Sequence, residues 1–139
     1  MYKRDFILRI IEQIAQFIAR MLNLVQDDKK EDAYDFMVKN SGKVVDVSYD
    51  DLIKMGVEGF MDMILQKEIT SDYLDILGKY FLISAELCLK MEKDQEAILH
   101  IELSKACFQE STDRFKTYSF NRQVDLDQLH QLMVRVGLN

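Results

Sequence analysis

The sequence contains no proline and no tryptophan, and it has only two cysteines and two histidines. Average usage would place about seven prolines in a chain of this length. Because proline interrupts helix interiors, its absence favours a chain of helices joined by polar corners. Two cysteines do not make a disulfide framework, so we expect Cys88 and Cys107 to be reduced, buried thiols of a cytosolic protein.

Positive charge is also scarce, since 18 lysines and arginines stand against 24 acidic residues and give a net charge of −6. Non-specific nucleic-acid binding depends on cations that neutralise phosphates, so we expect no nucleic-acid partner. The first 26 residues depart from this balance and carry Lys3, Arg4, Arg9 and Arg20 against Asp5 and Glu12. We expect this basic segment to dock on an acidic body; binding to a membrane surface is the alternative.

Long apolar runs are missing as well. The apolar stretch 73–89 is interrupted by three charged residues, so it is not suited to cross a bilayer. The chain begins like a signal peptide, but Asp5, Arg9 and Glu12 interrupt the apolar part and no small-residue cleavage site follows. We therefore expect a cytoplasmic protein without stable membrane insertion.

The residues that are present indicate one globular domain spanning 1–139, because 48% are hydrophobic and 30% are charged. Apolar residues recur every three to four positions in residues 5–26, which predicts a long amphipathic helix. Similar patterns predict helices at 29–39, 72–91, 94–109 and 121–136, with short helices from Ser48 to Gly56 and over 57–66. We expect residues 43–47 to form an extended loop and residues 110–120 to form another. The predicted fold is all-α, with six to seven helices.

A helix–corner–helix pattern occurs twice in the sequence. Three residue pairs fall into register when the copies are aligned 64 positions apart: Phe17 with Phe81, Ala33 with Ala97, and Met37 with Ile101. In the second copy Ala85 and Ala97 are both small, as two closely approaching antiparallel helices require. In the first copy Met21 takes the place of Ala85. The pattern therefore predicts two helical hairpins of one design.

At these positions the chain resembles the tetratricopeptide repeat, whose hairpins carry a bulky and a small residue on the first helix and an alanine early in the second. The two copies are not in tandem, and the signature Trp, Leu-Gly and terminal Pro are missing. The opening YKRDFILRIIEQ is similar to that of a family of uncharacterised bacterial proteins, many from Firmicutes, with tetratricopeptide-like helices. The resemblance implies tetratricopeptide-like α-hairpins packed with a closing C-terminal helix.

The resemblance also implies a binding face. Tetratricopeptide domains hold extended or helical peptides on the concave side of their hairpins. Carried over position by position, this face falls on Lys79, Leu82, Glu86, Leu89 and Lys90. The same face is equally suited to be internal and covered by the middle helices.

Residues 113–123 alternate basic and aromatic side chains. The basic residues are Arg114, Lys116 and Arg122, and the aromatic ones are Phe115, Tyr118 and Phe120. Such a segment is suited to hold single-stranded nucleic acid or an acidic peptide. Alternatively, the aromatic side chains pin a long loop to the body while the cations meet acidic helices. We take Arg114, Lys116, Tyr118 and Arg122 as a second candidate for partner binding.

Both histidines share a helix face with a carboxylate about one turn earlier, Glu96 for His100 and Asp127 for His130. A di-iron bundle needs two Glu-x-x-His units and two further glutamates, and this set is absent from the sequence. We therefore expect no metal and no cofactor.

These observations predict a non-enzymatic module that binds a protein or peptide, or a scaffold that forms a homodimer through its long amphipathic helices. One alternative is a small helical enzyme, dependent on a metal or small molecule and built around Glu96, His100 and Cys107. Another is peripheral membrane binding through the basic first helix.

Overall fold

The computed structural model describes residues 2–138, with the side chains of residues 4–138, and within that range every element is helical. The helices number seven if the five-residue α3 is counted: α1 (Tyr2–Gln26), α2 (Lys30–Lys39), α3 (Ser41–Val45), α4 (Tyr49–Leu65), α5 (Ser71–Lys90), α6 (Asp94–Phe115) and α7 (Phe120–Arg135). The predicted all-α fold is confirmed.

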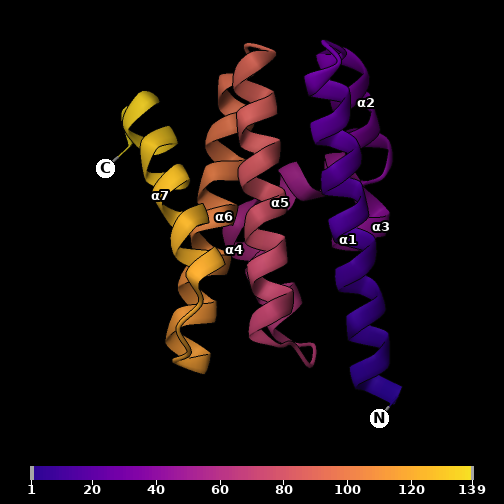
Figure 1. The fold of residues 1–139 in the computed structure, drawn as a ribbon, viewed down its shortest axis with the longest axis vertical. Coiled ribbons are helices and arrows are strands. Elements are labelled where there is room, and N and C mark those ends of the chain that lie inside the picture. The colour runs from indigo at the N-terminus through magenta and orange to yellow at the C-terminus, as the bar shows by residue number, and fades with distance from the viewer. Residues whose placement is uncertain (1, 139) are drawn as a thin grey trace.

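Four helices stand side by side in Figure 1, with α1 and α7 at opposite edges and α5 and α6 between them. Helices α2, α3 and α4 lie behind this row. Packing joins α1 to α5, α5 to α6 and α6 to α7, while α2 contacts α1 and α5, and α4 contacts α6. The row therefore has one face backed by α2–α4 and one face turned to the viewer.

Hydroxyl side chains cap the N-termini of three of the helices. Ser48, Thr70 and Ser119 each accept a hydrogen bond from the backbone N–H three residues on, at 3.1, 3.1 and 3.2 Å. Such N-caps satisfy one of the backbone donors that the first helical turn leaves without a partner.

The corners of the hairpins α1–α2 and α5–α6 have the same backbone geometry. Each contains one left-handed residue, Asp28 with φ 64° and Glu92 with φ 58°. The next N–H donates to the carbonyl five residues earlier at 2.8 Å in both corners, from Lys29 to Leu24 and from Lys93 to Cys88. This is the Schellman arrangement of a helix C-terminus, and the two copies lie 64 residues apart as the sequence alignment predicts.

The main core joins residues from α1 to α6, and a smaller second cluster joins α5 and α6 to α7. The hairpin α5–α6 is tightly closed at Gly78, where an added Cβ would lie 2.6 Å from the ring of Phe108. The Ser104 hydroxyl donates to the Gly78 carbonyl at 2.7 Å. The smaller cluster identifies α7 as the helix that covers the outer side of this hairpin.

Two predicted boundaries are corrected by the structure, and one is confirmed. Residues 43–45 belong to α3 instead of an extended loop, because one helical turn buries both Val44 and Val45. The break predicted at Gly56 is present, since this residue has a non-helical backbone with φ 68° and divides α4 into two helical parts across a kink. Helix α6 continues past residue 109 to Phe115, since Ser111 is buried and Phe115 packs on the core.

Candidate functional site

The predicted face of α5 is divided between the solvent and the interior. Lys79, Glu86 and Leu89 are half-buried and Lys90 is exposed. Leu82 is fully buried and belongs to the cluster that α7 covers. A partner on an open face cannot reach Leu82, so this part of the prediction is wrong. The covering element is α7, and not the middle helices that the sequence suggested.

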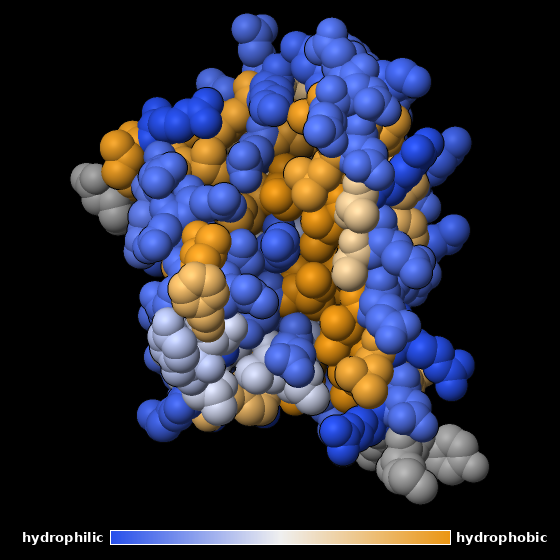
Figure 2. Space-filling model, viewed as in Figure 1, coloured by the Kyte–Doolittle hydropathy of each residue, from blue (hydrophilic) through white to orange (hydrophobic). Residues whose placement is uncertain are grey.

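The open side of α5 lies toward α1, where Ile76 and Ile83 are half-buried. Helix α1 presents Leu8, Ala15 and Leu22 at intervals of seven residues, which places them on one stripe of the helix. Leu8 is 47% and Leu22 43% exposed. Figure 2 shows a hollowed band of apolar surface between the two columns of polar side chains over α1 and α5. We call this band the α1–α5 groove.

The lower end of the α1–α5 groove widens into a hollow of about 660 Å³. Arg4, Leu8 and Ile11 line it from α1, and Asp72 lines it from the first turn of α5. Arg114 reaches the same hollow from the end of α6. Of the predicted basic and aromatic residues, Arg114 and its neighbour Phe115 thus border this concave surface.

The other residues of the predicted basic–aromatic loop do not form one site. Only residues 116–119 lie outside helices, and Lys116 and Tyr118 are exposed. Arg122 is buried, donates from Nε and Nη2 to the Asp75 carboxylate at 2.9 and 3.2 Å, and donates from Nη1 to the Thr117 carbonyl at 2.6 Å. The two hydrogen bonds to Asp75 join α7 to α5, and the third holds the loop between α6 and α7. Arg122 is therefore not available to a partner, and its prediction as a binding residue is wrong.

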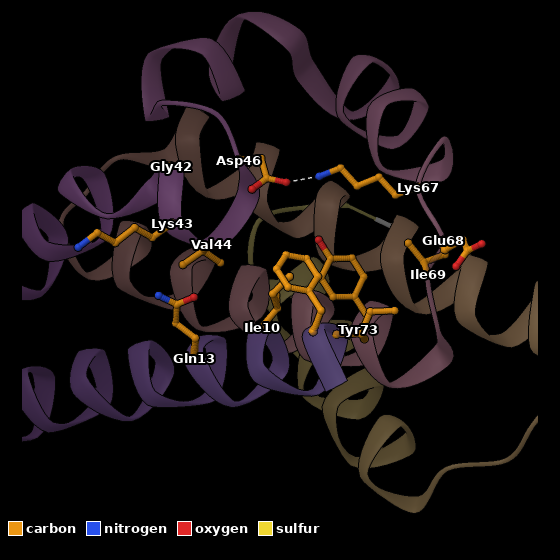
Figure 3. Close-up of a pocket in the computed structure, with 12 residues that line it drawn as sticks. Ile10, Gln13, Gly42, Lys43, Val44, Asp46, Lys67, Glu68, Ile69 and Tyr73 are labelled. Atoms are coloured by element: carbon orange, nitrogen blue, oxygen red, sulfur yellow. Dashed lines mark hydrogen bonds and ion pairs between the residues drawn. The ribbon is translucent and has the colours of Figure 1, made fainter. Parts of the chain in front are cut away.

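A second concave surface lies next to the first, with which it shares Ile7 and residues 67–69, and it is bordered by α3 and by the segment between α4 and α5. Its volume is about 710 Å³, and Figure 3 shows the residues around it. The apolar part of the lining consists of Phe6, Ile7, Ile10, Val44, Ile69 and the ring of Tyr73. We call this space the α1–α3 cavity.

The α1–α3 cavity follows from the unequal lengths of the first two helices. At 1.5 Å per residue, α1 is about 37 Å long and α2 about 15 Å. The shorter helix covers only the C-terminal half of α1, so the apolar residues of the N-terminal half are not covered by α2. Phe6 is 62% exposed as a result.

Polar groups at the α1–α3 cavity are few. The ammonium of Lys67 forms an ion pair with Asp46 across its rim (Figure 3). Tyr73 is only 8% exposed, and its hydroxyl has no hydrogen-bond partner among the described residues. Burial, with Asp46 and Cys107 nearby, raises the pKa of Tyr73 to about 12. The hydroxyl therefore keeps its proton at neutral pH and remains able to donate.

A buried polar network joins α2, α4 and α6. The hydroxyls of Tyr34 and Tyr49 donate to Oε1 of Glu96 at 2.6 and 2.7 Å. The Tyr49 hydroxyl also lies 2.8 Å from Nε2 of His100. Since that hydroxyl has one hydrogen and gives it to the carboxylate, Nε2 of His100 must donate. Nδ1 of His100 then presents a lone pair, and it is buried without a partner.

The surroundings of His100 keep its ring neutral. The ring is 1% exposed and stacks between Tyr49 and Phe81, with centroid distances of 5.7 and 5.9 Å. Burial lowers the pKa of His100 to about 4, although Glu96 opposes this shift. Burial also raises the pKa of the Cys88 thiol to about 12. The network is therefore neutral apart from Glu96 and has no route by which a substrate reaches His100.

The remaining candidate chemical groups are dispersed. Cys107 is fully buried, and burial raises the pKa of its thiol. His130 and Asp127 are both exposed on α7. Within residues 2–138, no group of three or more His, Cys, Asp and Glu side chains is placed to hold a metal ion.

Sequence reasoning missed the residues that shape the two concave surfaces. Of Leu8, Ala15 and Leu22, only Leu22 was assigned to the apolar stripe of the first helix, and their spacing of seven was the signal that they form a separate flank. The lengths of the predicted helices were the signal for the α1–α3 cavity. The helix predicted at 5–26 is twice as long as the one predicted at 29–39, so the second helix cannot cover all of the first.

None of the helices in the described part of the chain has the length and apolar character needed to cross a membrane. No family model matches the chain, and neither does any curated protein or any solved structure with which it was compared.

Proposed function

We propose that this protein is a non-enzymatic interaction module that holds an amphipathic helical segment of a protein partner in the α1–α5 groove. The observation that carries the proposal is the apolar flank of α1, Leu8, Ala15 and Leu22, beside Ile76 and Ile83 of α5. Exposed apolar patches rimmed by polar residues are typical of interaction sites. A helix laid in such a groove buries side chains that repeat every three to four positions.

The charges along α5 favour an amphipathic helix as the occupant. Asp72, Lys79, Glu86 and Lys90 follow one another with alternating sign along a ridge of α5 between the groove and α7, where Lys79 lies near Asp125 and Glu86 near Arg135. A partner helix with an apolar stripe and charges of alternating sign beside it would match both the groove and this ridge. Lys79, Glu86 and Lys90 thus keep a partner-binding role in the proposal, and Arg114 joins them at the lower end.

A second copy of the chain is one candidate for the partner. The residues Leu8, Ala15 and Leu22 are symmetric about Ala15, so two α1 helices packed antiparallel would place leucine on leucine and alanine on alanine. Such a contact is isologous and gives a closed dimer.

Site-specific photo-cross-linking in the native host tests the proposal. Benzoylphenylalanine would replace Leu8 or Leu22 in the groove, or Val134, which is 73% exposed on the far helix α7. We expect protein adducts from positions 8 and 22 but not from 134, and we expect the pair Lys79→Glu and Glu86→Lys to remove them. Adducts of twice the chain mass would identify a second copy. Lipid adducts alone, or equal adducts from all three positions, would refute the helix-binding groove.

A further inference from the structure

We propose that the α1–α3 cavity is a binding site for an uncharged, lipophilic small molecule that carries one hydrogen-bonding oxygen, such as a hydroxyl or a carbonyl. The α1–α3 cavity adjoins the hollow at the lower end of the α1–α5 groove, because Ile7 and residues 67–69 line both. The rest of its wall on α1 is formed by Phe6, Ile10 and Gln13, and it includes none of the groove residues Leu8, Ala15 and Leu22.

The size and lining of the cavity indicate a small molecule. Ligand sites commonly enclose about 300–1,000 Å³ and are mostly apolar with a few polar groups. The α1–α3 cavity, at about 710 Å³, lies within this range. Phe6, Ile7 and Ile10 form its wall on α1, and Val44 and Ile69 face them.

The Tyr73 hydroxyl indicates that the ligand carries a hydrogen-bond acceptor. Figure 3 shows this hydroxyl pointing into the space between Val44 and Asp46. The residue is 8% exposed, and its hydroxyl reaches the open space of the cavity, since His100 Nδ1 is the fully enclosed side-chain atom without a partner among the described residues. A few polar groups at the wall of an apolar pocket typically orient the ligand. A ligand oxygen would accept from this hydroxyl, and the Gln13 amide on α1 is an uncharged polar group in the same lining.

The charges around the cavity favour a neutral ligand. Lys67 and Asp46 are paired with each other, and the side chains of Lys43 and Glu68 point away from Tyr73 (Figure 3). An ionised head group beside Tyr73 would therefore lose its hydration without meeting an unpaired counter-charge. A neutral oxygen has a much smaller hydration to lose.

The experiment compares three ten-carbon ligands that differ only in the charge of the head group. N-phenyl-1-naphthylamine, a neutral fluorescent probe of apolar sites, would be bound to the protein and displaced by 1-decanol, decanoate or decylammonium below their micelle concentrations. We expect decanol to displace the probe at concentrations at least about tenfold lower than either ion. Equal displacement by the three compounds, or no binding of the probe, would overturn the proposal.

Two variants assign the binding to the cavity. Tyr73→Phe removes one hydrogen bond and should weaken decanol binding about three- to tenfold, whereas Tyr118→Phe, at an exposed tyrosine, should not. Gly42→Phe places a ring at the cavity wall, where an added Cβ meets nothing within 4 Å, and should block probe binding. Leu22→Glu in the groove should leave binding unchanged. A decanol affinity that is insensitive to Tyr73→Phe, or lost in Leu22→Glu, would contradict the assignment.

Discussion

The buried side chain of His100 contacts polar and aromatic side chains of two neighbouring helices. Its Nε2 bonds to Tyr49, its ring stacks on Phe81, and its Nδ1 has no partner. A protonated ring would need an acceptor for Nδ1–H as well, and no described group supplies one. The same contacts that join α4 to α6 therefore exclude the charged form of the ring.

Stability should consequently fall in mild acid because of His100. In the folded protein the pKa of His100 is about 4, against an ordinary value of 6.5, so the unfolded chain takes up the proton first as the pH falls. The contribution to stability is complete above about pH 6.5, declines between pH 6.5 and 4, and is lost below pH 4, a total of about 3 kcal/mol. Urea unfolding across this range, for the wild type and for His100→Gln, measures it.

The exposed His130 supplies the matched control for this pH dependence. The variant His130→Gln should keep the wild-type decline in the free energy of unfolding, whereas His100→Gln should lose the part due to that ring. Parallel curves for the wild type and His100→Gln would show that the buried ring does not resist protonation.

The hairpin corner is the element that the sequence repeats. Asp28 and Glu92 both adopt left-handed backbone conformations, which cost a residue with a side chain about 1 kcal/mol relative to glycine. Asp28→Gly and Glu92→Gly should each raise the free energy of unfolding, by up to about 1 kcal/mol after the greater flexibility of glycine in the unfolded chain is counted. The gain should be at least as large at Glu92, because aspartate tolerates this conformation better.

Urea unfolding of the two glycine variants beside Asp27→Gly tests the corner. Asp27 precedes the left-handed residue and has no positive φ, so glycine there should give no gain. If both corner variants were destabilised like Asp27→Gly, the shared corner geometry would not be the strained conformation that the fold repeats.

The elements themselves could largely be predicted from apolar periodicity, which reports which face of each helix is buried. The ends of helices could not, because they depend on contacts made elsewhere. Helix α6 extends to Phe115 because that ring packs against the core. The sequence of residues 110–115 does not by itself predict this contact. The role of Arg122 was hidden for the same reason, since its partner Asp75 lies 47 residues away.

At the scale of the whole molecule, the two concave surfaces arise from how helices of unequal length are arranged. The sequence contains the residues of both surfaces, but which flank of α1 stays uncovered depends on where α2 and α5 pack. Leu82 illustrates the limit, because it lies on the predicted binding face and is covered by α7. Candidate residues could thus be chosen from the sequence, while their exposure required the assembled fold.

The two thiols should report how this assembled fold opens. Cys88 on α5 and Cys107 on α6 are fully buried in the same core, and burial raises the pKa of both. Because the thiolate is the reactive form, Ellman's reagent should modify them only after opening exposes and ionises them. In native buffer we expect slow reaction that accelerates with urea, at the same rate in Cys88→Ala and Cys107→Ala, since α5 and α6 must separate to release either thiol. Fast modification of one remaining thiol, or clearly different rates in the two variants, would mean that the hairpin opens in parts instead of as one unit.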